Sequence, residues 1–111
     1  MALPVALQLY SVRDELEADF EGTIAKVRKF GYDGVEFAGL YGRSAEQVRK
    51  ILADAGLTPV SAHVPLDELL GDTQAVVATY KEIGCKYIVV PYLPEDRRPG
   101  TEGFDRTIED I

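Results

Sequence analysis

Hydrophobic and polar positions along the chain follow two alternating periods, which predict a repeating order of strands and helices. Short apolar or β-branched runs alternate with stretches in which apolar residues recur every three or four positions, as on one face of a helix. The predicted strands cover residues 5–10, 34–38, 58–64 and 86–91. The predicted helices cover residues 19–30, 45–55, 72–83 and 104–111, the last only as the beginning of a helix.

The first predicted helix shows both its apolar face and its cap. Its apolar positions are Phe20, Ile24, Val27 and Phe30. Asp19 is the expected N-cap, because a carboxylate there accepts a hydrogen bond from a free backbone N–H of the first turn. Gly22 lies inside the helix, where glycine costs up to about 1 kcal/mol relative to alanine. We interpret Gly22 as a place of close helix–strand contact.

Glycines divide the chain into units of similar length. Gly31, Gly56 and Gly84 each end a predicted helix, at spacings of 25 and 28 residues, and a strand follows each of them. Strand–helix alternation of this kind predicts βα units on a parallel sheet with right-handed crossovers. Eight such units form a (β/α)8 barrel. The predicted fold class is therefore α/β: one partial domain over residues 1–111, equal to the N-terminal half of a TIM barrel with outer helices.

The polar residues within the strands favour a barrel over an open sheet. They are Gln8, Tyr10, Glu36, Ser61 and His63. Side chains alternate across a strand, so these residues share one face, and aliphatic residues such as Val60 and Val64 are expected on the other. An open doubly wound sheet buries both faces under helices, whereas the inner face of a barrel opens at the C-terminal rim. We therefore place His63, the sole histidine, at the mouth of a barrel.

Composition narrows the class of protein further. The chain is 46% hydrophobic and 28% charged, typical of a globular protein, and its formal charge of −7 argues against a nucleic-acid partner. No apolar run reaches the roughly 20 residues of a membrane span, and the N-terminus lacks a signal-peptide pattern. Cys85 is the only cysteine, which we interpret as a buried, inert thiol. These features predict a cytoplasmic protein without a membrane partner.

Three segments together resemble a known family. They are Gln8-Leu9-Tyr10-Ser11-Val12-Arg13-Asp14, Gly31-Tyr32-Asp33-Gly34-Val35-Glu36-Phe37 and Val60-Ser61-Ala62-His63. In these segments the chain resembles the sugar phosphate isomerase/epimerase family, the xylose-isomerase-like TIM barrels, and the likeness extends to the strand that ends at Pro91.

The resemblance implies an enzyme of carbohydrate metabolism that acts on a small sugar, a sugar phosphate, a polyol or an inosose. It implies a divalent metal (Mn, Mg, Co or Zn) and an enediolate intermediate, with metal ligands on the later strands of the barrel. Those strands have no counterpart here, so no catalytic or metal-ligating residue is identified and no cofactor is expected in this chain. The residues transferred as substrate-binding are Gln8, Tyr10, Glu36 and His63. We expect an active full-length parent enzyme, an inactive fragment, and a homo-oligomer or domain swap through exposed sheet edges.

Other interpretations of the same residues remain open. An endonuclease IV-like DNA-repair relative would use a histidine at the end of the third strand as a zinc ligand, but the negative charge opposes this. A non-enzymatic α/β module would bind a ligand or partner through the same rim. His63 also fits a hydrogen-bonded structural histidine, and Glu36 fits a rim carboxylate without function.

Overall fold

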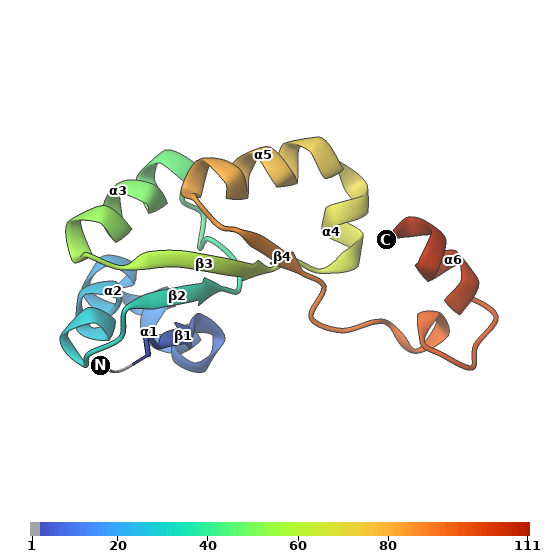
Figure 1. Ribbon diagram of the computed structural model, residues 1–111, viewed down its shortest axis with the longest axis horizontal. Coiled ribbons are helices and arrows are strands. Elements are labelled where there is room, and N and C mark those ends of the chain that lie inside the picture. Colours follow the sequence, from blue (N-terminus) through green and yellow to red (C-terminus); the bar gives the residue numbers. More distant parts are fainter. Residues whose placement is uncertain (1–2) are drawn as a thin grey trace.

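The computed structural model, which describes residues 3–111, is an α/β fold built on one parallel four-stranded sheet (Figure 1). The strands lie in sequence order, β1-β2-β3-β4, and each pairs in parallel with the next. They are β1 (Ala6–Gln8), β2 (Gly34–Phe37), β3 (Thr58–His63) and β4 (Tyr87–Val89). Sequence order in a parallel sheet is the order of strands in a (β/α)8 barrel, so the predicted fold class is confirmed.

Helices join the strands and cover one face of the sheet. They are the 3-10 helix η1 (Leu9–Val12), α1 (Arg13–Ala18), α2 (Phe20–Lys29), α3 (Ala45–Ala55), α4 (Leu66–Gly71), α5 (Thr73–Ile83), the 3-10 helix η2 (Glu95–Arg97) and α6 (Phe104–Asp110). Within residues 3–111, none of these helices has the length and apolarity needed to cross a membrane.

Short helices occupy two connections that the sequence left irregular. The residues after β1 form η1 and α1 instead of continuing a strand to residue 10, because the Gln8 side chain accepts a hydrogen bond from the backbone N–H of Tyr10. After β3 the chain turns directly into α4, in a segment for which no helix was predicted. Asp72 then accepts a hydrogen bond from the N–H of Ala75 and starts α5 as a separate helix.

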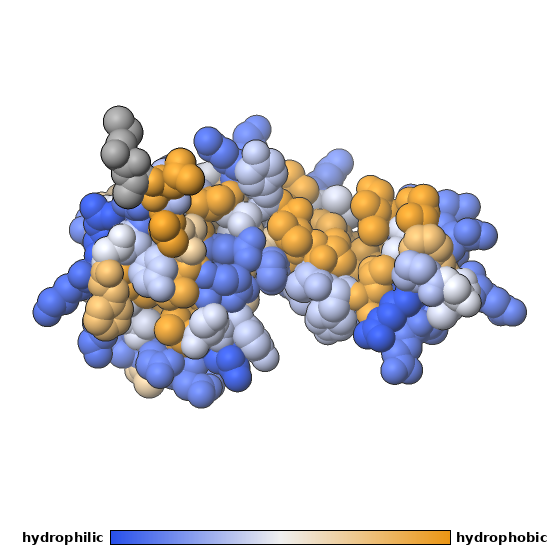
Figure 2. Space-filling model, turned by 60° about the horizontal axis from the view of Figure 1, so that its bottom comes forward, coloured by the Kyte–Doolittle hydropathy of each residue, from blue (hydrophilic) through white to orange (hydrophobic). Residues whose placement is uncertain are grey.

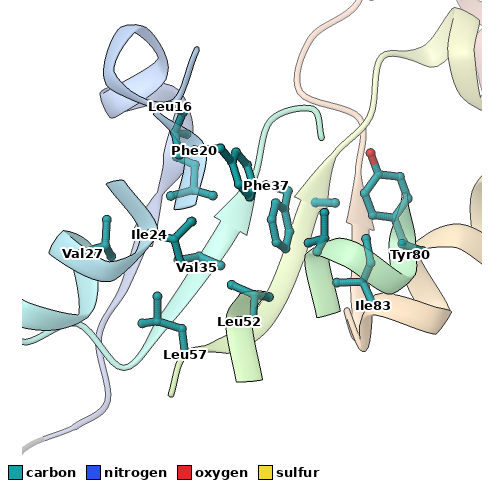
Figure 3. Close-up of a cluster of buried hydrophobic side chains, with 14 of the residues drawn as sticks. Leu16, Phe20, Ile24, Val27, Val35, Phe37, Leu52, Leu57, Tyr80 and Ile83 are labelled. Atoms are coloured by element: carbon teal, nitrogen blue, oxygen red, sulfur yellow. The ribbon is translucent and has the colours of Figure 1, made fainter. Parts of the chain in front are cut away.

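The hydrophobic core lies between the sheet and α2, α3 and α5 (Figure 3). Helix residues such as Ile24 and Leu52 pack against strand residues such as Val35 and Phe37, and all four are almost completely buried. One predicted core position is wrong. Phe30 is 76% exposed, because α2 ends at Lys29 and Phe30 is its C-cap, beyond the last turn that faces the sheet.

Gly22 makes room for the cap of its own helix. Asp19 Oδ1 accepts a hydrogen bond from the Gly22 N–H at 3.0 Å. A Cβ added at Gly22 would collide with the Asp19 carboxylate, whose atoms are the three nearest to it. The N-cap carboxylate therefore explains this glycine, in place of the predicted helix–strand contact.

A bulge in β3 shifts the register at the point where the polar residues begin. Val35 pairs with Pro59 while Glu36 pairs with Ser61, so Val60 is an extra residue. A Cβ added at Gly34 would lie 3.1 Å from Val60 Cγ2 and 3.6 Å from Ala6 Cβ, which puts Val60 on the inner face. The alternation rule had placed Val60 on the helix-covered face, and the bulge overturns that assignment.

The inner face of the sheet has no helical cover in the described residues. Tyr87 and Val89 lie opposite Ser61 and His63 in register and are 64% and 37% exposed. Figure 2, which turns this side toward the reader, shows hydrophobic surface along it and a hollow between the sheet and the C-terminal part. After β4 the chain extends to η2 and α6, which stand apart from the sheet (Figure 1). An ion pair between Arg97 and Asp110 joins these two helices.

Candidate functional site

The register of the sheet gathers the polar strand residues at one place. Gln8 is opposite Glu36, and Glu36 is opposite Ser61, so three neighbouring strands present these side chains side by side. His63 follows on the same face two residues after Ser61, at the last position of β3. The bulge makes this possible, because an unshifted register would have set Val60 opposite Glu36. The carboxyl ends of parallel strands are where α/β proteins bind ligands.

Glu36 is the centre of the cluster. Its Oε1 lies 3.0 Å from His63 Nε2, and its Oε2 accepts a hydrogen bond from the Ser61 hydroxyl at 2.5 Å. The Glu36 and His63 side chains are 23% and 29% exposed, so both reach solvent although internal contacts fix their positions. A carboxylate with two oxygens has about four acceptor positions. Glu36 therefore keeps acceptor capacity for a ligand after its two internal contacts are made.

Gln8 connects the cluster to the backbone of η1. Its Nε2 lies 3.3 Å from His63 Nδ1, and its Oε1 accepts the Tyr10 N–H at 2.7 Å. We call Gln8, Glu36, Ser61 and His63 the rim cluster. All its buried polar side-chain atoms have partners, as do those of the rest of residues 3–111. The rim cluster is thus an ordered hydrogen-bonded unit.

Tyr10 reaches the same place from a different element. The sequence placed it on the first strand, but it lies in η1, and the residue is 57% exposed. The Arg13 guanidinium sits over its ring, 4.2 Å from the centroid, and also donates to the Tyr10 carbonyl. These contacts hold the ring beside the cavity described next.

A cavity of about 560 Å³ opens beside the rim cluster. Its lining is Gln8, Tyr10, Ala38, Gly39, His63, Pro65, Glu68, Pro91 and Tyr92. Ligand sites in proteins are commonly apolar hollows of this size with a few converging polar groups. The four residues predicted to bind substrate are thus brought together: three in the rim cluster, with Tyr10 on the cavity wall.

Three residues at this site escaped the sequence-based prediction. Ser61 was predicted only as one of the polar residues of the third strand. Its spacing of two residues from His63 puts both side chains on one face of the strand, and this was the available signal for its contact with Glu36. Glu68 lies on α4, a helix that the sequence did not predict. Tyr92 follows the last strand by three residues, and its only signal was its place next to Pro91 at a strand end.

The donor set at this site does not fit a resident metal ion. Structural and catalytic metal sites use at least three protein ligands. Within residues 3–111, no three His, Cys, Asp or Glu side chains converge in a way that would hold a metal. Glu36 and His63 are the one histidine–carboxylate pair among the described salt bridges, and they contact each other.

Two groups outside the site, the buried Tyr80 and the half-buried Cys85, have shifted pKa values. Burial raises the pKa of the Cys85 thiol to about 11, and burial together with the nearby Glu68 raises the pKa of Tyr80 to about 12. Both groups therefore stay protonated at neutral pH, which keeps Cys85 weakly nucleophilic because the thiolate is the reactive form.

Comparison with known proteins supports the fold and leaves the activity open. No family model matches the chain, and no curated protein does either. Two crystal structures, each described as a sugar phosphate isomerase/epimerase from Parabacteroides distasonis ATCC 8503, are similar to it. One aligns with a TM-score of 0.68 at 24% identity and the other with 0.69 at 23%.

The alignments cover 83% of this chain but 43% and 40% of the two solved chains. This chain thus spans less than half the length of the structures it matches. The family resemblance of the sequence is confirmed at the level of the fold: the chain has the architecture of part of a TIM barrel similar to these sugar phosphate isomerase/epimerases.

Proposed function

We propose that the chain forms one wall of the ligand site of a sugar isomerase or epimerase, and that the rim cluster binds hydroxyl groups of the ligand. The observation that carries the proposal is the convergence of Gln8 and His63 on one cavity, with Glu36 on the strand between them in contact with His63. The likeness to two sugar phosphate isomerase/epimerases supports the choice of a sugar over other small ligands.

The chemistry of the lining suits a polyhydroxylated ligand. On the cavity wall, the second N–H of the Gln8 amide is free to donate to a hydroxyl oxygen, and Glu36, which contacts the lining residue His63, has unused acceptor positions for a hydroxyl proton. The rings of Tyr10 and Tyr92, with two prolines, give apolar walls for the C–H faces of a sugar. A ligand that presents both O–H and C–H groups can bind the polar residues and the apolar rings of this site together.

The isomerase chemistry itself needs groups beyond this wall. A divalent metal and an enediolate belong to the proposal only through the family resemblance, and the donor set of residues 3–111 does not fit the metal. We therefore assign to this chain the binding and orientation of hydroxyl groups. Proton transfer and carbonyl polarisation fall to residues that the larger barrel would supply.

A titration followed by NMR tests this role. The ¹⁵N-labelled chain is titrated with fructose, fructose 6-phosphate and an inosose, each with Mn²⁺-free buffer containing EDTA. We expect weak, millimolar binding with signal changes confined to the rim cluster and cavity walls, because one wall makes only part of the contacts. Glu36→Gln should abolish the changes. Glu46→Gln, which removes an equal charge from the exposed first turn of α3, should leave them intact.

Two results would overturn the proposal. If no NMR signal of the rim cluster changes up to the solubility limit of the ligands, the proposed binding role is wrong. Tight, micromolar binding without metal would instead identify a complete binding module, since a single wall does not supply that affinity.

A further inference from the structure

The orientation of the Gln8 amide is set by a backbone group. A backbone N–H always donates, so the Gln8 atom that lies 2.7 Å from the Tyr10 nitrogen must be the amide oxygen. The amide nitrogen then faces His63 Nδ1 at 3.3 Å. The amide cannot be turned around without placing its NH₂ group against the Tyr10 N–H.

This orientation fixes the protonation of His63. The amide NH₂ of Gln8 only donates, so Nδ1 must act as the acceptor and carries no proton. The remaining imidazole proton therefore resides on Nε2, which lies 3.0 Å from Glu36 Oε1 and donates to it. His63 is neutral in this arrangement, with its donor and its acceptor sides both defined.

The groups around the ring agree with this assignment. Glu36 on β2 accepts from both His63 and Ser61. The other ionisable groups that line the cavity are Glu68 on α4, Tyr10 on η1 and Tyr92 beyond β4. Among the ion pairs of residues 3–111, the ring takes part only in the one with Glu36, which meets Nε2 and leaves Nδ1 to Gln8.

We propose that Gln8 is a positioning residue: held by the Tyr10 backbone, it keeps Nδ1 of His63 unprotonated while Glu36 accepts the Nε2 proton, so that the ring on the cavity wall stays neutral and fixed. This deepens the proposed function, since His63 is one of the side chains that line the proposed sugar site. Gln8 acts through His63, and its contribution does not require that Gln8 itself touch the ligand.

The test is the tautomer of His63 in the ligand-free chain, read from the ¹⁵N signals of the single imidazole ring at neutral pH. The parent should show a protonated Nε2 and an unprotonated Nδ1. Gln8→Glu offers Nδ1 an acceptor while keeping one for the Tyr10 N–H, so both ring nitrogens should become protonated. Gln8→Ala leaves Glu36 holding the Nε2 proton but removes the N–H group that keeps Nδ1 unprotonated, so the ring should become a mixture of the neutral Nε2–H form and the doubly protonated form. Gln74→Glu, the same change at an exposed position of α5, should match the parent.

Two outcomes would overturn the proposal. One is a parent ring with a protonated Nδ1. The other is a Gln8→Ala variant with the same folded spectrum and the same ring signals as the parent, which would show that Gln8 does not set the tautomer. Because no ligand is present, the result is separate from the titration that tests sugar binding. A variant that failed to fold would be recognised by the loss of amide dispersion, and Gln8→Asn would then replace it, with the same predicted gain of a proton at Nδ1.

Discussion

Glu36 and Ser61 should be energetically coupled, because each satisfies the other at a partly buried position. The Ser61 hydroxyl donates to Glu36 Oε2 at 2.5 Å, and Ser61 is only 6% exposed. Replacing Glu36 by alanine leaves the hydroxyl without this acceptor. Replacing Ser61 by alanine leaves the carboxylate with one internal donor, His63.

The size of the coupling follows from the kind of bond and its exposure. A hydrogen bond to a charged group contributes about 1.5–3 kcal/mol to stability when it is well buried. The Glu36 side chain is 23% exposed, so water replaces part of the lost bond and the contribution falls. We expect a coupling free energy of about 1–2 kcal/mol between the two positions.

A double-mutant cycle in urea, followed by far-ultraviolet circular dichroism, measures this coupling. The cycle compares the unfolding free energies of the parent, Glu36→Ala, Ser61→Ala and the double variant. The matched control cycle pairs Ser61→Ala with Glu46→Ala, whose carboxylate lies in the first turn of α3 on the other side of the sheet. Additive effects within about 0.3 kcal/mol in the Glu36 cycle would refute the hydrogen-bonded rim cluster.

Three further predictions concern the frame around the site. Gly22→Ala should change the unfolding free energy by under about 0.5 kcal/mol, because the gain in helix propensity is offset by loss of the Asp19 cap. In an Asp19→Ala background the same substitution should stabilise the protein by up to about 1 kcal/mol. Equal effects in both backgrounds would contradict this. Burial raises the pKa of Cys85 from 9.0 to about 11, so the unfolded thiol loses its proton first and stability should fall as pH rises from about 9 to 11; a Cys85→Ala variant with the same alkaline profile would count against this. Sedimentation velocity should show self-association through the open sheet. Val89→Lys should reduce this association, whereas Ala53→Lys, which adds the same charge on the outer side of α3, should not. A monodisperse monomer at all concentrations would contradict the prediction.

The fold could be predicted because its signals are local and repeated. Helix stripes, N-caps such as Asp19 and the helix-ending glycines at 56 and 84 are set by residues a few positions apart, and the structure shows the Asp19 cap and left-handed C-caps at both glycines. Parallel βα units then follow from the alternation alone. Four such units in sequence order are enough to recognise a part of a barrel.

The site was predicted less completely because it depends on contacts between strands. Gln8, Glu36 and His63 stood out as polar residues on one face, but their pairing depends on the bulge at Val60, which has no signature in the sequence. The short helices η1 and α4 were also missed, since each is stabilised by few residues. As a result Tyr10 was placed on a strand and Glu68 was not considered.

The measurement that tests the central claim most directly is the contact between a bound sugar and the rim cluster. Nuclear Overhauser effects from fructose protons to the ring protons of His63 report this contact in the chain as it is. We predict effects at His63 and at the ring of Tyr10, lost in Glu36→Gln and kept in Glu46→Gln. Fructose effects that reach neither ring, or that survive unchanged in Glu36→Gln, would contradict the proposal that this rim binds the hydroxyl groups of a sugar.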